Sequence, residues 1–287
     1  MRVAIVGVGA VGGALAGMLD RAGKHQLTLC TRRPMPRLTV TWPEGETQVK
    51  ARNVIAPHQA EPVDWVIVAT KTYDAEGAAS WFPALCARGA PVAVVQNGVE
   101  HRARFLPYIA SERLLPVVIN CPVERPGDGQ VQVRGACTMK VEAGDLAREF
   151  ASLFAGAAAT VELAPDFVTA AWEKLCINAA GVLCALTQKP NSVLWSEPMS
   201  TIAAGIVEEC AAVGRAEGAQ LDAAMGQRVL DHYRRLPADS INSLLADRLA
   251  GRRMEVDARN GVIVRKGQKH GIAMPLNQMA VALLEVI

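Results

Sequence analysis

Short apolar runs and stretches of helical spacing alternate along the first half of the chain. The apolar runs are residues 3–6, 27–31, 64–69 and 91–95, and helical spacing occurs at residues 10–22 and 74–87. A short run without polar alternation is typical of a strand that is buried on both faces. Strands that alternate with helices predict an α/β fold with a parallel, doubly wound sheet.

Two pairs of short β-rich runs predict hairpins in the same part of the chain, and a further strand is predicted at residues 117–119. The hairpin runs are residues 38–41 with 48–51 and residues 123–124 with 130–133, and each pair flanks a Pro- and Gly-containing turn. Beyond Asp166 the β pattern stops, and helices are predicted over residues 167–186, 199–217, 223–236, 257–270 and 278–287. We therefore expect an α/β domain over residues 1–165 and an all-α domain over residues 166–287.

Composition and charge exclude several classes of protein. The 287 residues are 51% hydrophobic and 20% charged, and the net charge of +2 indicates neither nucleic acid nor an anionic membrane as a partner. The longest apolar run, residues 175–186, is interrupted by Asn178, so we expect no membrane span. The seven cysteines lack CxxC and metal-ligand spacing, which predicts reduced thiols in a cytoplasmic protein without a metal site.

A glycine-rich loop joins the first predicted strand to the first predicted helix. It has the sequence GxGxxG and consists of Gly7, Val8, Gly9, Ala10, Val11 and Gly12. In such a loop the first glycine allows a tight turn, the second admits a pyrophosphate, and the third lets helix and strand pack closely. The helix N-terminus offers free N–H groups to the phosphates. A turn without a ligand is the alternative, but the order strand, loop, helix favours a Rossmann-type dinucleotide-binding domain.

The end of the second strand indicates which dinucleotide binds. NAD sites usually carry Asp or Glu there to accept hydrogen bonds from the ribose, whereas this strand ends in Thr31-Arg32-Arg33. A guanidinium binds the 2′-phosphate of NADP through paired hydrogen bonds. We therefore predict NADP as the cofactor and Arg32 as the residue that binds its phosphate, with two solvated arginines as the alternative.

Two polar residues follow the next strands of the predicted sheet. Lys71 comes after residues 64–69, and Asn97 comes after residues 91–95. Each is also compatible with simple turn chemistry, since Asn-Gly alone is a strong turn signal. Ligands of open parallel sheets bind at the carboxyl ends of the strands, so the shared position favours roles near the cofactor for both.

A strongly apolar helix in the second half carries a lysine. Lys174 and Asn178 are four residues apart and hence lie on one face of the helix. An ammonium in apolar surroundings is costly unless it is bound, and it is able to protonate a carbonyl oxygen as hydride reaches the carbon. The alternative is that the Lys174 side chain extends to the surface.

Polar residues of a later segment are candidate partners of this lysine. Glu255 follows Gly251-Arg252-Arg253, and Ser243 lies a short distance upstream. Glu255 is a candidate for holding the substrate or the lysine. A solvated turn with a helix N-cap at Asp257, and simple helix capping by the serines and asparagine of residues 240–243, are the alternatives.

Together these residues resemble the ketopantoate reductase (2-dehydropantoate 2-reductase) family over essentially the whole chain. The resemblance is carried by the glycine loop, Lys71, Gln96-Asn97-Gly98, Lys174 with Asn178, Ser243, Ala250-Gly251-Arg252-Arg253 with Glu255 and Asp257, Asn260-Gly261, and His270-Gly271-Ile272 with Pro275. It implies reduction of a 2-oxo acid at C2 by NADPH, with 2-dehydropantoate as the small-molecule substrate. It also implies catalytic roles for Lys174 and Glu255, substrate binding by Asn97, Asn178 and Ser243, and cofactor binding by Lys71 and Asn97.

The sequence departs from the family at two points and leaves other functions open. Val182 stands where the family often has a second asparagine, and Asn120-Cys121-Pro122 lacks the expected Thr/His character. One alternative is therefore an NADPH-dependent reductase of a different 2-oxo acid, and another is an NADP-binding regulatory protein without turnover. The sequence does not set the oligomeric state, and a homodimer is compatible with it.

Overall fold

The computed structural model describes all 287 residues. Its contacts divide the chain into two compact units. The α/β unit comprises Met1–Gln96 and Glu100–Phe167, and the helical unit comprises Asn97–Val99 and Val168–Ile287. Each unit is described by itself.

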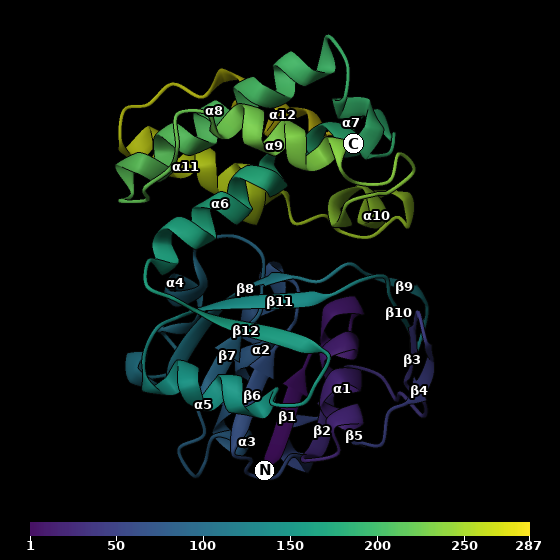
Figure 1. Ribbon diagram of the computed structural model, residues 1–287. Helices are drawn as coiled ribbons and strands as arrows, with labels where there is room; N and C mark the ends of the chain where they lie inside the picture. The colour runs from purple at the N-terminus through teal and green to yellow at the C-terminus, as the bar shows by residue number, and fades with distance from the viewer. The chain divides into compact units, whose positions relative to one another are not determined.

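An eight-stranded sheet with the order β12-β11-β8-β7-β6-β1-β2-β5 forms the centre of the α/β unit (Figure 1). Its strands are β1 (Arg2–Val6), β2 (Gln26–Cys30), β5 (Arg52–Val54), β6 (Trp65–Val68), β7 (Val92–Val94), β8 (Leu114–Asn120), β11 (Cys137–Glu142) and β12 (Ala159–Ala164). All neighbours from β5 to β8 pair in parallel, whereas β11 is antiparallel to β8 and parallel to β12. The predicted α/β fold with a parallel sheet is confirmed, and β11 and β12 extend it beyond the prediction.

The two predicted hairpins form one small sheet with the order β4-β3-β10-β9, although β4 spans Gly45–Gln48 rather than residues 48–51. Its strands are β3 (Thr39–Trp42), β4 (Gly45–Gln48), β9 (Val123–Gly127) and β10 (Gln130–Val133). β3 and β10 pair in parallel, so strands from distant parts of the chain join the hairpins into one sheet.

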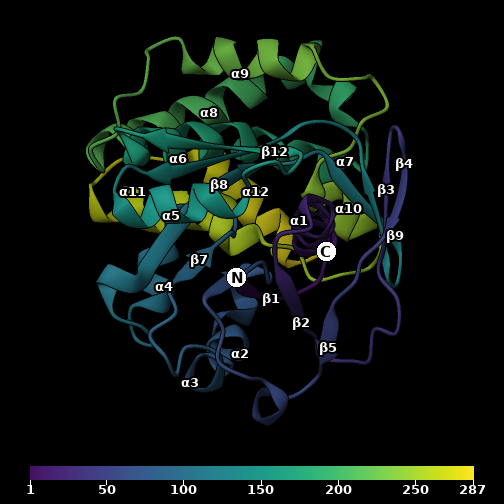
Figure 2. The same cartoon turned by 60° about the horizontal axis from the view of Figure 1, so that its bottom comes forward.

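Helix α1 (Ala10–Ala22) lies between the large sheet and the small one, as Figures 1 and 2 show from two sides. Small residues allow this close packing. A Cβ added to Gly13 would lie 2.6 Å from Val131 Cγ2, and one added to Gly17 would lie 2.8 Å from Val40 Cγ2. The small sheet therefore covers α1 on the side that faces away from the large sheet.

Short helices complete the α/β unit. They are α2 (Ala75–Ala79), α3 (Phe82–Leu85), α4 (His101–Phe105) and α5 (Asp145–Leu153). The single helix predicted over residues 74–87 is wrong, because the chain forms α2 and α3 with a break between them. Pro83 lacks an N–H group for an intrahelical bond and is tolerated only in a first turn, so the helix restarts just before it.

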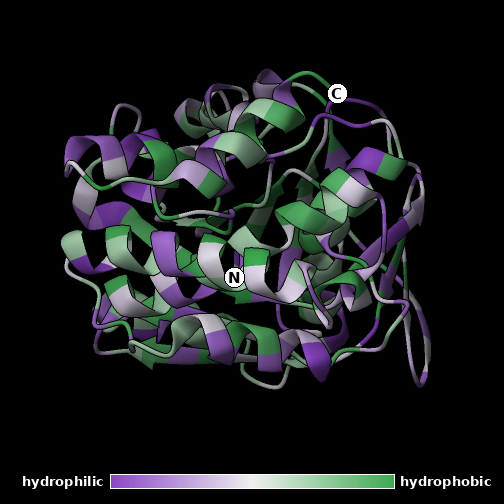
Figure 3. Cartoon of the chain, turned by 90° about the horizontal axis from the view of Figure 1, so that it is seen from above, coloured by the Kyte–Doolittle hydropathy of each residue, from purple (hydrophilic) through white to green (hydrophobic).

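The helical unit contains seven α-helices around one apolar core. They are α6 (Phe167–Ala180), α7 (Val182–Thr187), α8 (Met199–Ala216), α9 (Met225–Arg234), α10 (Ser243–Leu249), α11 (Val262–Lys269) and α12 (Pro275–Glu285). Figure 3 shows helices that carry hydrophobic and hydrophilic residues side by side, as amphipathic helices do. The all-α character of this part is as predicted.

Four details of the helical unit differ from the predicted pattern. The helix expected over residues 167–186 is broken at Gly181, and the one expected over residues 257–270 begins with a π-helical turn, Asp257–Gly261. The last helix begins at Pro275 rather than at residue 278, and α10 was not predicted. All of these departures except the start of the last helix lie in or next to segments that carry candidate site residues.

By length and composition alone, Phe167–Thr187 is long and apolar enough to cross a membrane, even though Asn178 interrupts its apolar run. Most of this segment is buried inside the protein. The core helix of a soluble protein satisfies the same requirement.

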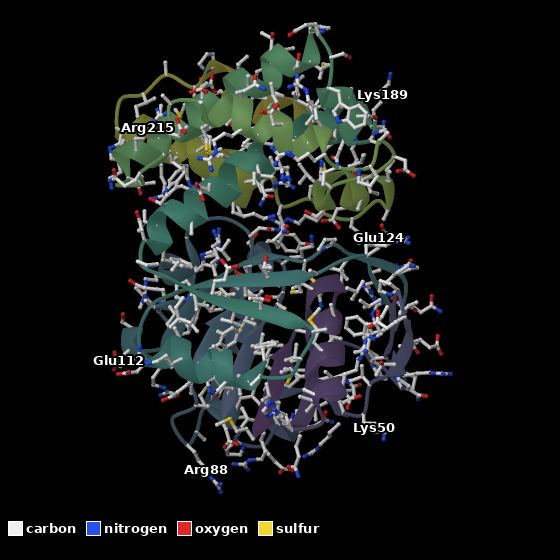
Figure 4. The ribbon with its side chains drawn as sticks, viewed as in Figure 1. Lys50, Arg88, Glu112, Glu124, Lys189 and Arg215 are labelled. Carbon is white, nitrogen blue, oxygen red and sulfur yellow. The ribbon has the colours of Figure 1, made fainter.

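Charged side chains in both units are exposed. Figure 4 labels examples from the α/β unit (Lys50, Arg88, Glu112 and Glu124) and from the helical unit (Lys189 and Arg215).

Candidate functional site

Two glycines of the loop between β1 and α1 are required by the protein itself. Gly7 has φ +92°, and a Cβ there would lie 2.7 Å from the main-chain nitrogen of Thr70. A Cβ at Gly12 would lie 2.1 Å from the carbonyl oxygen of Gly7. The first glycine therefore permits the turn and the last permits the approach of α1 to the loop, as the sequence pattern predicts.

Gly9 has no such structural reason to be glycine. Its φ of −85° suits any residue, and no heavy atom lies within 4 Å of an added Cβ. The N-terminus of α1 has no side-chain cap and no acidic residue in its first turn. An open space beside uncapped N–H groups fits the pyrophosphate of a dinucleotide.

The loop after β2 carries the predicted 2′-phosphate residue. The side chain of Arg32 is 86% exposed, and its Nη1 lies 3.4 Å from Asp74 Oδ2. An exposed ion pair of this length contributes little, so the guanidinium is available to an anion. No acidic side chain stands at the end of β2 to accept a ribose hydroxyl.

Asn53, which sequence reasoning missed, holds this loop in place from strand β5. Its Nδ2 donates to the carbonyl oxygen of Leu29 at 3.0 Å and to Thr31 Oγ1 at 2.8 Å, and its Oδ1 accepts from the Met35 N–H at 2.9 Å. One side chain thus fixes the main chain on both sides of Arg32. The only hint in the sequence is an asparagine within a short β-rich stretch.

Gln96 connects the ends of β6 and β7. Its side chain is buried, and its Nε2 donates to Thr70 Oγ1 at 3.0 Å and to the carbonyl oxygen of Lys71 at 3.3 Å. Gln96 Oε1 is buried and accepts no hydrogen bond within the protein. Lys71 is half-buried and extended, directly after β6. The ends of β6 and β7 thus present an unused acceptor and a cation close together.

Three predicted residues meet in the helical unit. Asn97 Nδ2 donates to Glu255 Oε2 at 3.1 Å, and Asn178 Nδ2 donates to Asn97 Oδ1 at 3.5 Å. Glu255 is only 5% exposed, so it does not lie in a solvated turn. A buried carboxylate that accepts an amide hydrogen bond can orient a polar ligand.

Lys174 lies one turn before Asn178 on α6, and both side chains are half-buried, whereas Leu175 and Cys176 between them are buried. Burial lowers the pKa of His232 on α9, and the positive charge of Lys174 lowers it further. The lysine is thus on the partly open face of an otherwise buried helix, which is where a proton donor must be to meet a substrate.

Ser243 is the exposed first residue of α10 and does not cap it. Asn242 is the cap, since its Oδ1 accepts from the N–H groups of Leu244 and Leu245 at 3.0 and 3.1 Å. Asp257 does not cap its helix either and pairs with Arg265.

Val182 is fully buried in the core of the helical unit and offers no polar group. No three His, Cys, Asp or Glu side chains cluster as metal ligands would.

Comparisons with known proteins agree with this arrangement. The family model described as ketopantoate reductase PanE/ApbA matches residues 3–146, and its C-terminal counterpart matches residues 166–287. A 2-dehydropantoate 2-reductase of Caulobacter vibrioides is 46% identical over 98% of this chain and 97% of its own length. One of Mycobacterium tuberculosis (strain H37Rv) is 38% identical over 98% of this chain and 96% of its own length.

The fold is similar as well. The crystal structure of a PanE/ApbA family ketopantoate reductase from Ralstonia eutropha JMP134 has a TM-score of 0.91 at 33% identity and covers 100% of this chain and 98% of its own. The resemblance predicted from the sequence is thereby confirmed over both units. The chain belongs to the ketopantoate reductase family and is an oxidoreductase of that family.

Proposed function

We propose that this protein reduces 2-dehydropantoate at C2 to pantoate with NADPH, as a step of pantothenate biosynthesis. The observation that carries the proposal is the Asn178–Asn97–Glu255 cluster one helical turn from Lys174. Relatives at 46% and 38% identity are named 2-dehydropantoate 2-reductases. Family membership implies a nicotinamide cofactor, and NADP is the form that the residues of this chain favour.

The α/β unit supplies the groups that would hold NADPH, which when bound provides the hydride for C2. Gly7, Val8, Gly9, Ala10, Val11 and Gly12 form the phosphate loop, and the guanidinium of Arg32 binds the 2′-phosphate. A phosphate dianion offers Arg32 paired hydrogen bonds that the half-buried carboxylate of Asp74 does not provide at 3.4 Å. Lys71 and Asn97 complete the set of proposed cofactor contacts.

The helical unit supplies the proton and the substrate contacts. Hydride addition to the ketone builds negative charge on its oxygen, and the ammonium of Lys174 stabilises that charge and donates the proton. Asn97, Asn178 and Ser243 bind the substrate through amide and hydroxyl groups. Glu255 orients the substrate and the lysine, and its burial strengthens its hydrogen bonds.

A reductase of a different 2-oxo acid is the second candidate, and Val182 favours it. Its apolar side chain is fully buried, so this position adds no amide for a substrate hydroxyl. The NADP-binding regulatory protein without turnover is the third, and the retention of Lys174 with the Asn178–Asn97–Glu255 cluster argues against it.

One assay separates these candidates. NADPH oxidation is measured with ketopantoate and with branched 2-oxo acids that lack the hydroxyl. We expect the highest kcat/KM for ketopantoate. A preference for an unhydroxylated acid would establish the second candidate instead, and tight NADP binding without any turnover would establish the third.

The cysteines indicate the cellular compartment. All seven cysteines are free thiols, which is typical of the reducing cytoplasm, and we propose that the enzyme acts there. A homodimer stays a prediction, for which light scattering of the purified protein is the measurement.

A further inference from the structure

Side chains bind the carbonyl groups at the end of α6. Helix α6 ends at Ala180, and α7 begins at Val182 after the single turn residue Gly181. Two side chains donate to carbonyl oxygens near Asn178: Tyr233 Oη to the Ile177 oxygen at 2.9 Å, and Arg259 to the Asn178 oxygen itself. Two amide groups donate to carbonyl oxygens closer to the turn: Asn260 Nδ2 to the Ala179 oxygen at 3.3 Å, and Asn242 Nδ2 to the Gly181 oxygen at 3.1 Å. We refer to Tyr233, Asn242, Arg259 and Asn260 as the α6 clamp. It fixes the helix end beside Asn178.

The clamp closes tightly on Gly181. A Cβ at this position would lie 2.9 Å from Asn242 Nδ2, 2.9 Å from Tyr233 Oη and 3.0 Å from Arg259 Nη2. Three donors from different elements thus converge on one small residue. The turn at Gly181 is therefore held in place by side chains from other elements.

Arg259 is the unusual member of the clamp because it is a fully buried cation, 1% exposed. Burying a guanidinium is costly unless hydrogen bonds and an opposite charge compensate it. Its Nε has no hydrogen-bond partner, so the Asn178 carbonyl is its main anchor. Burial lowers the pKa of Arg259, while interactions with Tyr233 and the carboxylate of Glu255 oppose that shift.

The position of Arg259 connects it to the proposed reaction. It lies in the π-helical turn Asp257–Gly261, four residues after Glu255, and π-helical turns occur frequently at functional sites. It binds the main chain of Asn178, whose side chain donates to Asn97, and Asn97 in turn donates to Glu255. One guanidinium thus donates to the main chain of Asn178 at the start of this hydrogen-bonded series, and its positive charge interacts with that of Glu255 at the other end.

We propose that Arg259 is a positioning residue for the reduction: it fixes the main chain of Asn178 and compensates the charge of Glu255, and thereby holds the Asn178–Asn97–Glu255 cluster in its productive arrangement. The inference rests on the proposed function of that cluster. Arg259 itself is buried, and we assign it no contact with the substrate.

The test compares two variants of Arg259 with a matched clamp variant. Arg259→Met removes the charge and the bond to Asn178, Arg259→Lys retains the charge with one donor group, and Tyr233→Phe removes only the neighbouring bond to Ile177. Steady-state kinetics are measured well below each melting temperature. We expect Arg259→Met to lower kcat at least tenfold with an unchanged KM for NADPH, Arg259→Lys to lower it about threefold, and Tyr233→Phe to lower the melting temperature while kcat stays within twofold.

Two results would overturn the inference. In the first, Arg259→Met, or Arg259→Lys if the methionine variant does not fold, keeps kcat within twofold of the wild type. In the second, Tyr233→Phe loses as much activity as Arg259→Met. The α6 clamp would then act by stabilising the fold, and Arg259 would have no positioning role of its own.

Hydrogen exchange separates this inference from the proposed function, because it does not depend on turnover. We expect Arg259→Met to speed amide exchange at residues 178–187 more than Tyr233→Phe does, even if the wild type reduced none of the acids assayed. Equal exchange in the two variants would refute the positioning role, whereas inactive wild-type protein would refute the proposed function.

Discussion

Gly9 and Gly12 lie three residues apart in one loop, yet they are glycines for different reasons. Space around Gly9 is open to a distance of 4 Å, whereas Gly12 faces a main-chain oxygen. We expect Gly9→Ala to leave the melting temperature unchanged and to weaken NADPH binding at least tenfold, since the methyl group occupies the space assigned to the pyrophosphate. Calorimetric titration with NADPH measures the effect.

Gly12→Ala is the matched control for this loop. Its Cβ would lie 2.1 Å from the Gly7 oxygen, and main chain does not yield as a flexible side chain does. We expect a loss of about 1–3 kcal/mol in the free energy of unfolding, which is the usual cost of overpacking. Unimpaired NADPH binding by Gly9→Ala would show that the loop does not hold the pyrophosphate.

Asn53 permits a test of cofactor selectivity at the residue scale. Its three hydrogen bonds fix the main chain on both sides of Arg32. We expect Asn53→Ala to lower the ratio of kcat/KM for NADPH over NADH at least fivefold, with the NADH value nearly unchanged, because only NADPH carries the phosphate. The Arg32→Ala variant should show the same selective loss, and the double variant little more.

This selectivity prediction has a clear negative outcome. If Asn53→Ala or Arg32→Ala impaired NADH and NADPH equally, the loop after β2 would serve the fold rather than the 2′-phosphate. For each variant, kcat/KM for NADPH and kcat/KM for NADH are measured on the same protein sample. A partial loss of folded enzyme therefore lowers both values equally and leaves their ratio unchanged.

At the scale of elements, the start of α4 makes the α/β unit sensitive to acid. His101 is 1% exposed, its Nε2 donates to the carbonyl oxygen of Gln96 at 2.8 Å, and burial lowers its pKa from 6.5 to about 4. Between these two values the unfolded chain binds a proton that the folded chain excludes. The free energy of unfolding therefore falls as the pH decreases from 6.5 to 4, by up to about 3 kcal/mol.

Urea unfolding at pH 7.5, 6 and 5 measures this dependence. We expect His101→Gln to be less stable than the wild type at pH 7.5, because a hydrogen bond is altered, but to lose less stability on acidification. Parallel pH dependences of the two proteins would contradict the assignment to His101.

The periodic pattern predicted elements well where a single principle decided them. The parallel strands and the long helix α8 follow directly from hydrophobic spacing. Short or partly exposed elements were missed: β11 buries only alternate residues, β12 has no fully buried residue, and α10 is a seven-residue helix that begins at its Asn242 cap. The break at Gly181 escaped prediction because the clamp that stabilises it comes from residues 52 to 79 positions later in the chain.

Across the whole chain, the sequence named the members of the Asn178–Asn97–Glu255 cluster, but it did not show which other residues hold them. Lys174 and Asn178 share a helix face by spacing alone, but the bond between Asn97 and Glu255 joins residues 158 positions apart. Arg259 and Asn53 carry no motif, and the roles proposed for them rest on burial and hydrogen bonding alone. The resemblance to a family supplied the proposed roles of the site residues, and the fold supplied the reasons for proposing the supporting ones.

The proposed reaction couples a hydride from NADPH to a proton from Lys174, and the Lys174→Ala variant removes that proton donor. We predict a decrease in kcat of about 10²–10⁴-fold with ketopantoate, with NADPH affinity within twofold of the wild type. Lys174→Arg should not restore the rate, because a guanidinium with a pKa above about 12 is a very poor proton donor. Turnover by Lys174→Ala at a near wild-type rate would contradict the claim.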